Sequence, residues 1–501
     1  DHKVMLMHNY ALARCASADN IPQLFMTMGA MGGHMGKSGH ACGGAYKTYA
    51  GAGGPALVKF GETGLPATKN ALADTMPEPL MWQCIREGRY NSTGAAYGVN
   101  FNAEDIKETE FKWLNIEGRN TLQTAVGLSD AREAIQKLDF VTDLAYTFDT
   151  SAAYADIVLP CATEWERVGG FAGHQRSRET VVVYSRVTEP LWEAKTEFEI
   201  GRMLAARLGM DPDELWPITE EQAFFNQIVG CTYVDAAGEE KPLVTITADD
   251  IAKWGVDAEP QEGDIALDDF LSAGCYTVKR AEGDGYSYIG YKDFVDDPEA
   301  NPRESASGKL EIYCQYKGDM LNSMGYSPAG TFKPYPTYVA SPEGREGMFA
   351  DRQIGGAASE YPLIVYNPHY LRRAHGVMDN VPWLREAWSA PVFVSAADAA
   401  ARGVADGDTV RVYSAHGSVL RTASVVEMLM PGCVGLPHGA WADFSKDDGI
   451  DVAGMDNVLC GSVTSGMGTS GYNNYNCNFE KYEGEALVAD CELPCRTVAM
   501  A

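Results

Sequence analysis

Two hydrophobic periods alternate along the middle of the chain. Short apolar runs at residues 111–120, 139–148 and 155–160 have the length and composition of β-strands. Residues 129–138 and 197–209 instead place their apolar positions at helical spacing, which predicts two helices. Strands that alternate with helices favour a parallel sheet with crossover helices, so we expect an α/β fold with a parallel-sheet, Rossmann-like domain.

The last third of the chain has the pattern of a β-rich region. Apolar or alternating runs at residues 362–367, 391–395, 408–426 and 433–441 are separated by glycine turns, and His416-Gly417 gives a hairpin signal inside the third run. A barrel closes short strands on one another and leaves no free edge. We therefore predict a C-terminal β-barrel domain.

Two other stretches are less regular. Residues 21–28 have helical spacing and predict a helix that ends near Gly29. The glycine-rich stretch that continues to Gly54 is either a loop that approaches a ligand closely or a flexible linker, and its spacing does not distinguish the two. Residues 210–345 hold many acidic, Pro and Gly residues, and for them we predict loops and helices that end in a strand at Leu310–Tyr313.

These patterns divide the chain into three predicted parts. Residues 1–60 are the end of an α/β domain with a glycine-rich loop, and residues 61–345 are an α/β domain with a long excursion at 210–300. Residues 346–501 are the β-barrel domain, and the boundary before it follows from the linker-like composition of residues 341–362.

The composition of the chain indicates which partners and which metal sites are not expected. Forty Lys and Arg against 69 Asp and Glu give a net charge of −29, a field that repels nucleic acids and anionic lipid head groups. No apolar run reaches the roughly 18–20 residues of a membrane-spanning helix. The twelve cysteines include no CxxC pair, and we interpret the nearest approach, Cys491 and Cys495, as two ordinary thiols. The visible residues therefore predict no metal site.

A series of motifs spread over nearly the whole sequence resembles one known family. In the first half they are GAMGGHMGKSG, IEGRNTLQT and FVTDLAYTFDTSAAYADIVLPCATEWERVGG. In the second half they are YKDFVDDPEANPRESASGKLEIYC, HYLRRAHGVMDN, GVADGDTVRVYSAHG, PGCVGLPHGAW and SGYNNYNCNFEKY. In this order they are similar to the motifs of the molybdopterin oxidoreductase, or dimethyl sulfoxide reductase, superfamily. Within it, the sequence most resembles the catalytic subunit of membrane-associated anaerobic dimethyl sulfoxide reductases.

The resemblance implies a cofactor, a reaction and a longer subunit. The cofactor is expected to be bis(molybdopterin guanine dinucleotide) with molybdenum or tungsten, and the reaction to be the reduction of a sulfoxide-type or N-oxide-type oxo or hydroxy compound in anaerobic respiration. Family members begin with a cysteine-rich [4Fe-4S] segment that does not precede Asp1 here. We therefore expect the chain to be the C-terminal portion of a catalytic subunit, and its barrel to be of the double-psi type.

The family also implies partners and a location. These are an iron–sulfur electron-transfer subunit, a membrane anchor subunit and a small-molecule substrate, but no nucleic acid, at the periplasmic or extracytoplasmic face of a membrane. Three other functions remain open from the sequence: reductive dehydroxylation of catechols, a non-catalytic scaffold subunit of the same fold, and a free-standing nucleotide-binding protein.

The resemblance assigns cofactor contacts to the loop after the first predicted strand. Gly118, Asn120 and Thr124 match positions at which family members contact a guanine nucleotide. A glycine permits close backbone approach to a ligand, and the two polar side chains supply hydrogen-bonding groups. The alternative interpretation is a simple turn with an Asx cap.

The loop after the next strand departs from the family pattern. The family places an Asp five residues before a Thr or Ser, and this chain has Ala145 at the matching position. Thr150 and Ser151 retain the hydroxyl groups, and Asp143 or Asp149 is the candidate replacement for the missing carboxylate. This departure is the feature that motivates the scaffold hypothesis.

A loop of the barrel domain supplies the next candidates. His369, Arg373, His375 and Gly376 follow the apolar run 362–367, where family members contact the pterin and the diphosphate. A guanidinium fork matches phosphate oxygens, and a histidine beside a phosphate favours its protonated form. The alternative is a solvated basic turn on an acidic protein. His438 is expected to be a packed histidine rather than a ligand-binding residue.

Near the C-terminus, a run of polar residues matches the segment that closes over the pterin in the family. Tyr472, Asn473 and Asn474 precede the apolar run 477–482, and buried amides require partners. An Asn-rich surface turn is the alternative. The sequence assigns no catalytic residue.

Overall fold

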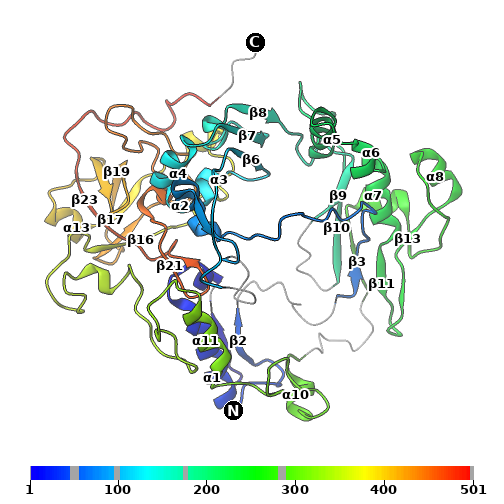
Figure 1. The fold of residues 1–501 in the computed structure, drawn as a ribbon, viewed down its shortest axis with the longest axis horizontal. Helices are drawn as coiled ribbons and strands as arrows, with labels where there is room; N and C mark the ends of the chain where they lie inside the picture. The colour runs from blue at the N-terminus through cyan, green and yellow to red at the C-terminus, as the bar shows by residue number, and fades with distance from the viewer. Residues whose placement is uncertain are drawn as a thin grey trace. The chain divides into compact units, whose positions relative to one another are not determined.

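The computed structural model describes residues 2–8, 10–45, 56–94, 102–172, 179–279 and 289–496 (Figure 1). The chain forms two compact units. Unit 1 consists of Asp1–Met7, Met28–Ala73 and Leu159–Leu310, and unit 2 consists of His8–Thr27, Asp74–Val158 and Glu311–Ala501. Each unit therefore combines segments that are far apart in the sequence, and the three-part division given above stays a prediction.

Unit 2 contains the parallel strands expected from the hydrophobic pattern. Its small sheet has the order β6-β7-β8, with β6 at Trp113–Glu117, β7 at Phe140–Ala145 and β8 at Ile157–Pro160. Strands β6 and β7 are parallel, and Glu117 lies opposite Leu144 in their register. Helices of this region are α2 (Met81–Glu87), α3 (Thr121–Thr124) and α4 (Leu128–Ile135). The α/β prediction for this part of the chain is confirmed.

The closed barrel is also confirmed. Six strands form it in the order β16-β20-β17-β19-β18-β23 (Figure 1). Two of its pairings, β16 with β20 and β17 with β19, are parallel, and the remaining pairings around the barrel are antiparallel. The predicted hairpin joins β18 to β19, where the Ser414 N–H donates to the Gly417 carbonyl at 2.9 Å. The strands are β16 (Leu363–Tyr366), β17 (Val392–Ser395), β18 (Thr409–Tyr413), β19 (Ser418–Val426), β20 (Cys433–Gly435) and β23 (Asn476–Lys481).

One hydrophobic core joins the barrel to the small sheet within unit 2. Ile116 and Val141 from the sheet are in the same buried cluster as Val365, Val394 and Val434 from the barrel. The three barrel valines have no exposed surface at all. Because this shared core fixes the sheet against the barrel, the loops at the ends of both sets of strands are held by packed elements.

Further elements of unit 2 surround this core. The helix predicted over residues 21–28 is present as α1, Ile21–Met31, whose C-terminal turn passes into unit 1. The remaining elements are β4 (Arg89–Asn91), β5 (Ile106–Glu108), α11 (Gln315–Ser323), α12 (Pro382–Ala387), α13 (Ala396–Ala401), β21 (Thr464–Ser465) and β22 (Thr469–Ser470).

The strand predicted at Leu310–Tyr313 is wrong. These residues form bends that lead into α11, and they belong to no sheet. The side chains of Ile312 and Tyr313 are 41% and 61% exposed, so the apolar run is not buried on either side. An alternating pattern predicts a strand only where a partner strand and a core are available, and neither is present at this position.

Unit 1 has its own core, built by the region predicted as an excursion. Helix α5 (Glu197–Arg207) begins at a capping box in which Thr196 Oγ accepts from the Glu199 N–H, as the prediction for residues 197–209 requires. Phe225 and Phe270 are fully buried at the centre of this second core. The region predicted as loops and helices thus contains several short strands as well. Among the described residues, no helix combines the length and apolar character needed to cross a membrane.

The other elements of unit 1 are short. They are β1 (Met5–His8), β2 (Ala41–Ala45), β3 (Val58–Lys59), β9 (Gly169–Phe171), β10 (Thr180–Ser185), α6 (Pro212–Leu215), α7 (Glu220–Val229), β11 (Thr232–Val234), β12 (Glu240–Pro242), β13 (Val244–Thr245), α8 (Ala248–Trp254), β14 (Ile265–Ala266), α9 (Leu267–Ala273), β15 (Cys275–Thr277) and α10 (Lys292–Asp296). Part of the glycine-rich stretch, residues 46–54, lies outside the described residues.

Candidate functional site

The loops after β6 and β7 meet at one edge of the small sheet. Because the two strands are parallel, their carboxyl ends lie side by side. The Oδ1 atom of Asn120 accepts hydrogen bonds from the backbone N–H of Ser151 at 3.1 Å and from its hydroxyl at 2.7 Å. The Ser151 Oγ in turn accepts from the Leu122 N–H at 3.0 Å. The structure therefore brings Asn120 and Ser151 together, and their polar groups hold the two loops to each other.

Gly118 gives this edge an open backbone surface. Its φ is +62°, in the left-handed region that favours glycine, and a Cβ added there would meet no protein atom within 4 Å. Thr124 lies on the same loop, where its Oγ1 accepts from the Arg119 Nε at 2.7 Å. The backbone at Gly118 is thus free to approach a ligand.

Two buried acceptors at this edge have no partner. Asp143 is 2% exposed and Thr150 is fully buried, yet among the described residues neither Asp143 Oδ2 nor Thr150 Oγ1 makes a hydrogen bond. Burial, reinforced by the charge of Asp149, raises the pKa of Asp143 to about 7. Asp149 is different, because its Oδ1 accepts from the N–H groups of Ser151 and Ala152. Of the two candidate replacements for the missing carboxylate, Asp143 is the one whose carboxyl group has an open acceptor.

Gln123 connects this edge to the barrel loops of unit 2. Its side-chain Nε2 donates to the carbonyls of Gly439 at 2.5 Å and Ala440 at 3.2 Å, and it is only 3% exposed. A Cβ added at Gly376 would lie 2.0 Å from Gln123 Oε1, so this glycine is required for the close packing of its loop. Asn457 donates to the Gln123 carbonyl as well. Gly376 therefore has a packing role in this structure.

Three histidines of the barrel loops form a cluster. The ring centres of His369 and His375 are 4.8 Å apart, and the ring centre of His438 is 5.6 Å from that of His369 and 5.4 Å from that of His375. Nδ1 of His375 and Nε2 of His438 are separated by 3.3 Å, within hydrogen-bond reach. We expected His438 to be a packed histidine rather than a ligand-binding residue, and in the structure its ring packs beside both predicted histidines.

A buried carboxylate orients this cluster. Asp456 is 3% exposed, and its Oδ2 lies 2.9 Å from His438 Nδ1 and accepts from Asn367 Nδ2 at 3.0 Å. Burial opposes a charge on His438 and Arg373 adds repulsion, but the hydrogen bond and charge of Asp456 outweigh them and raise the pKa of His438. The imidazole at position 438 therefore holds its proton more firmly than an ordinary histidine.

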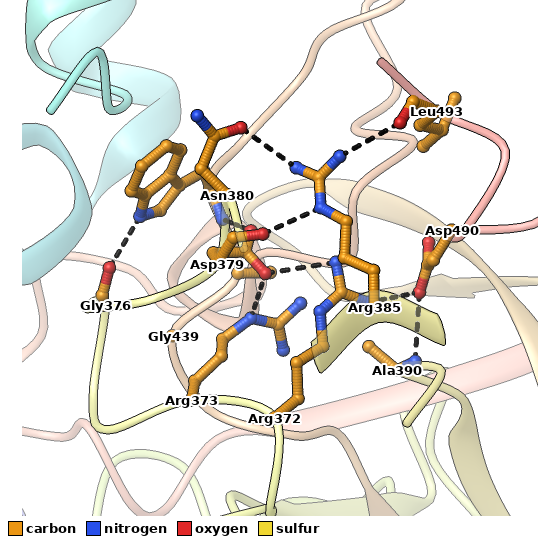
Figure 2. A network of polar contacts seen from close by, with 12 residues as sticks. Arg372, Arg373, Gly376, Asp379, Asn380, Arg385, Ala390, Gly439, Asp490 and Leu493 are labelled. Carbon is orange, nitrogen blue, oxygen red and sulfur yellow. Dashed lines mark hydrogen bonds and ion pairs between the residues drawn. The ribbon is translucent and has the colours of Figure 1, made fainter. Parts of the chain in front are cut away.

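Arg373 is part of a buried network of arginines and aspartates. Figure 2 shows the guanidinium groups of Arg372 and Arg373 converging on the carboxylate of Asp379. Arg372 also pairs with Asp490, as does Arg421, whose Nη2 lies 2.9 Å from the Asp490 carboxylate. Each of these five side chains is no more than 7% exposed. Arg373 is therefore buried against Asp379 in this structure, and its predicted contact with a diphosphate stays a prediction.

The network carries more positive than negative charge. A fourth arginine, Arg385, donates its Nε to the backbone carbonyl of Asp379 at 2.8 Å (Figure 2). The pKa values of Asp379 and Asp490 are lowered: burial opposes ionisation, but the neighbouring guanidinium groups outweigh it. Among the described residues, Arg373 Nη1 and Arg372 Nε are buried donors without an acceptor. The excess charge and these two open donors favour an anion nearby.

The predicted C-terminal residues divide into two groups. The hydroxyl of Tyr472 donates to the Thr124 carbonyl at 3.0 Å, so Tyr472 lies at the loop after β6. Asn474 donates to the Glu343 carbonyl at 3.2 Å and to Ser341, and thus fastens other segments of unit 2. Asn473 is exposed, and its backbone N–H donates to the Arg14 carbonyl. Of these three residues, only Tyr472 contacts the loop after β6, which carries other candidate residues.

Several residues of this site carry no local sequence signal. Gln123, His438, Asp456 and the aspartates of the arginine network become recognisable only when distant segments meet. The adjacent pair Arg372-Arg373 is the one sequence feature that marks the network. Among the described residues, no group of three or more His, Cys, Asp or Glu side chains has the arrangement of a metal site, and Cys491 and Cys495 are free thiols.

Two protein-family models match the chain. Residues 9–207 match the model described as Molybdopterin oxidoreductase, and residues 363–476 match the model described as Molydopterin dinucleotide binding domain. The second match runs from the start of β16 to the start of β23 and so covers five of the six barrel strands, the histidine cluster and most of the arginine network.

Curated relatives extend the match to nearly the whole sequence. The dimethyl sulfoxide/trimethylamine N-oxide reductase of Cereibacter sphaeroides is 27% identical over 503 residues, which are 54% of the relative and 98% of this chain. The dimethyl sulfoxide reductase DmsA of Escherichia coli is 26% identical over 44% of its own length and 79% of this chain. The trimethylamine-N-oxide reductase of Haemophilus influenzae is 25% identical over 50% of its own length and 88% of this chain. The chain thus spans about half the length of these relatives.

A solved structure has a similar fold. Acetylene hydratase from Pelobacter acetylenicus superposes with a TM-score of 0.52 and 18% sequence identity, over 46% of the hydratase and 78% of this chain. At this level of identity the likeness concerns the fold.

Proposed function

The chain belongs to the dimethyl sulfoxide reductase superfamily of molybdopterin oxidoreductases, and from this premise we propose that unit 2 binds bis(molybdopterin guanine dinucleotide) in an enzyme that reduces an oxo or hydroxy compound. The family models indicate a molybdenum or tungsten pterin dinucleotide as the cofactor. Our proposal adds three points to what the family models indicate: the guanine form of the dinucleotide, the presence of two pterins, and the type of substrate.

The observation that carries this proposal is a set of buried polar groups at the loops of unit 2 that have no partner among the residues described by the structure. A guanine or pterin ring edge presents N–H donors, and the open carboxyl oxygen of Asp143 is an acceptor for them. A diphosphate presents oxygen acceptors, and Arg373 Nη1 and Arg372 Nε are open donors. Gly118 adds a backbone surface that no side chain covers. The residues present therefore fit the chemistry of a pterin dinucleotide.

When bound, such a cofactor supplies two-electron redox chemistry at its metal, and the protein contributes binding, orientation and electrostatics. In our proposal Asp456 accepts from Nδ1 of His438, and in the neutral form of His438 this leaves Nε2 as an acceptor for Nδ1 of His375. In that form the arrangement selects the His375 tautomer that carries its proton on Nδ1. The histidine cluster thus holds protons at defined atoms beside the cofactor.

The arginine network has a second role in the proposal. Asp379 connects Arg372 and Arg373 of one loop to the Trp441 N–H of another, at 3.0 Å. The carboxylate thus fixes the loop positions before any ligand arrives, which lowers the ordering cost of binding. The positive excess of the network then favours an anionic cofactor over a neutral one.

The substrate class follows from the named relatives. Those relatives are reductases of dimethyl sulfoxide and trimethylamine N-oxide, at 25–27% identity to this chain. We propose a compound of the same type, a sulfoxide or N-oxide, with a catechol-type hydroxy compound as the second candidate. We further propose that electrons arrive through an iron–sulfur partner subunit at the periplasmic face of the membrane, as the family resemblance implies.

The proposal is tested with the natural full-length subunit, purified anaerobically from cells that make the cofactor. Reduced viologen serves as the electron donor, and dimethyl sulfoxide, trimethylamine N-oxide and a catechol are offered in turn. We expect oxidation of the dye with at least one of these compounds. A metal-loaded subunit that reduces none of them would support the scaffold function instead.

A further inference from the structure

A basic loop in unit 1 gathers two lysines and two histidines. We define it as residues 32–40 together with Lys3, and its basic residues are Lys3, His34, Lys37 and His40. The pairing of β1 with β2 brings Lys3 to the loop, because the Ala41 N–H donates to the Val4 carbonyl at 3.1 Å. A Cβ added at Gly39 would lie 3.4 Å from Lys3 Nζ, so this ammonium group lies directly over the loop backbone.

The side chains of His34, Lys37 and His40 lie close to the same stretch of backbone. Nδ1 of His34 and Nδ1 of His40 are 3.0 Å apart, and their rings stack with centres 5.2 Å apart. A Cβ added at Gly33 would lie 3.5 Å from Lys37 Nζ, and one added at Gly32 would lie 2.9 Å from His34 Nε2. Substitution at either glycine would occupy space that these groups use.

These basic side chains have no carboxylate partners among the described residues. None of the four takes part in an ion pair there, although the chain has 69 acidic residues and 40 Lys and Arg. Desolvation and the charges of His34, Lys37 and Lys3 lower the pKa of His40, which is the effect of a positive environment.

One further element packs against the loop. Helix α10 contacts it through Val295, which would lie 2.9 Å from a Cβ at Gly36. The same helix carries Lys292, Asp293 and Asp296, and Lys292 is paired with Asp296. Neither acid is among the groups that act on His40. The helix therefore supplies no carboxylate that acts on His40.

The backbone of the loop adds a row of donors. Among the described residues, the N–H groups of Met35–Gly39 donate to no acceptor. Gly36 and Gly39 have φ values of +68° and +74°, and left-handed residues within such a loop turn successive N–H groups toward one concave side. Backbone nests of this kind bind anions in many proteins.

We propose that the basic loop of unit 1 is a binding site for a phosphate-class oxyanion, held by Lys3, Lys37 and the two histidines together with the backbone N–H groups. Two lysine ammonium groups, two imidazoles and five backbone N–H groups that are unpaired among the described residues match a group with several oxygens and two charges. The phosphate is either inorganic or carried by a nucleotide. This inference goes beyond the cofactor site of unit 2, and it does not depend on the proposed function.

The site is tested by calorimetric titration of the whole chain with inorganic phosphate and, separately, with guanosine diphosphate. The double variant Lys3→Gln, Lys37→Gln removes both lysine charges of the basic loop. The matched control Lys241→Gln, Lys253→Gln removes two exposed lysines of the same unit. Circular dichroism and denaturant unfolding establish that both variants fold.

We expect phosphate to bind with a dissociation constant of about 1 mM or less, and the Lys3→Gln, Lys37→Gln variant to bind at least about tenfold more weakly. The control variant should bind as the parent chain does. If the binding of guanosine diphosphate also weakens in the Lys3→Gln, Lys37→Gln variant, the natural ligand is a phosphate carried by a nucleotide. If only the binding of inorganic phosphate weakens, the natural ligand is the free ion. Saturable binding that is equal in all three proteins, or none for either probe, would overturn the proposal.

Discussion

Asp456 and His438 form a buried carboxylate–imidazole pair, with Oδ2 and Nδ1 2.9 Å apart. The ring centre of His438 lies 5.6 Å from that of His369 and 5.4 Å from that of His375. Since the carboxylate fixes the tautomer of one imidazole and that imidazole faces another, a single side chain determines where protons are held across the cluster.

Replacing Asp456 by Asn should destabilise the protein most at acidic pH. The pKa of His438 is raised in the folded chain, so its contribution to stability is fully present below its ordinary value near 6.5 and is lost as the pH rises through the folded value. We expect Asp456→Asn to lower the free energy of unfolding by about 1–3 kcal/mol. Denaturant unfolding at about pH 5.5 and about pH 8.5 measures this loss. An equal loss at both pH values would show that His438 does not gain its proton affinity from Asp456.

Replacing Asp143 by Asn should separate stability from ligand binding. The pKa of this Asp is raised to about 7, so its ionisation disfavours the folded chain increasingly as the pH rises from its ordinary value near 3.9 toward 7. The amide stays neutral, and Asp143→Asn should therefore be more stable than the parent at about pH 8 and similar at about pH 4. Cofactor content should fall, because an amide offers one acceptor oxygen rather than two. If the Asp143→Asn variant keeps the full cofactor content, Asp143 does not contact the cofactor.

Removing the charge of Asp379 should be costly. This carboxylate is the partner of both Arg372 and Arg373, and all three side chains are buried. We expect Asp379→Asn to lower the free energy of unfolding by about 3–5 kcal/mol at neutral pH, since it removes the carboxylate that pairs with buried Arg373 and leaves Arg372 with Asp490 alone. The pKa of Asp379 is lowered, so the parent loses this contribution as the pH falls through the folded value, and the variant's deficit should shrink in acid.

An exposed ion pair provides the control for this experiment. Lys253 and Asp268 lie 3.1 Å apart, with side chains 62% and 73% exposed. Asp268→Asn should change stability by less than about 1 kcal/mol. Equal losses for Asp379→Asn and Asp268→Asn would contradict the role assigned to the buried network.

A bulky side chain in place of Gly118 should block a ligand without disturbing the protein core. No protein atom lies within 4 Å of an added Cβ there, so Gly118→Leu costs mainly the strain of a left-handed residue, about 1–2 kcal/mol. Gly238 is a matched control, because it also has a positive φ and open space, at a hairpin turn of unit 1. We expect Gly118→Leu to lower the cofactor content of the purified enzyme and Gly238→Leu to leave it unchanged. The same content in both variants would exclude a ligand at Gly118.

Local pattern was sufficient to predict the elements that position the site. The parallel strands β6 and β7, helix α4 and the barrel strands were all predicted from apolar periodicity and turn residues, and each is present. The run Leu310–Tyr313 has the same alternation but no partner strand, so pattern alone predicted an element that tertiary contacts do not support.

The polar interior of the site could not be predicted in the same way. Arg372 and Asp490 are 118 residues apart, and His375 and His438 are 63 residues apart. Such pairs form only when the barrel closes, and no local residue spacing predicts them. Asn474 shows a second limit, because an amide that matches a family motif also forms hydrogen bonds with the Ala16 N–H and the Glu343 carbonyl, which the motif does not predict.

The central claim is that the loops of unit 2 bind a pair of pterin guanine dinucleotides. The most direct test is the metal and nucleotide content of the full-length subunit, purified anaerobically from cells that make the cofactor. Elemental analysis and acid release of nucleotides should give about one molybdenum or tungsten atom and about two guanine nucleotides per chain. A correctly folded subunit that contains neither metal nor guanine nucleotide would contradict the account.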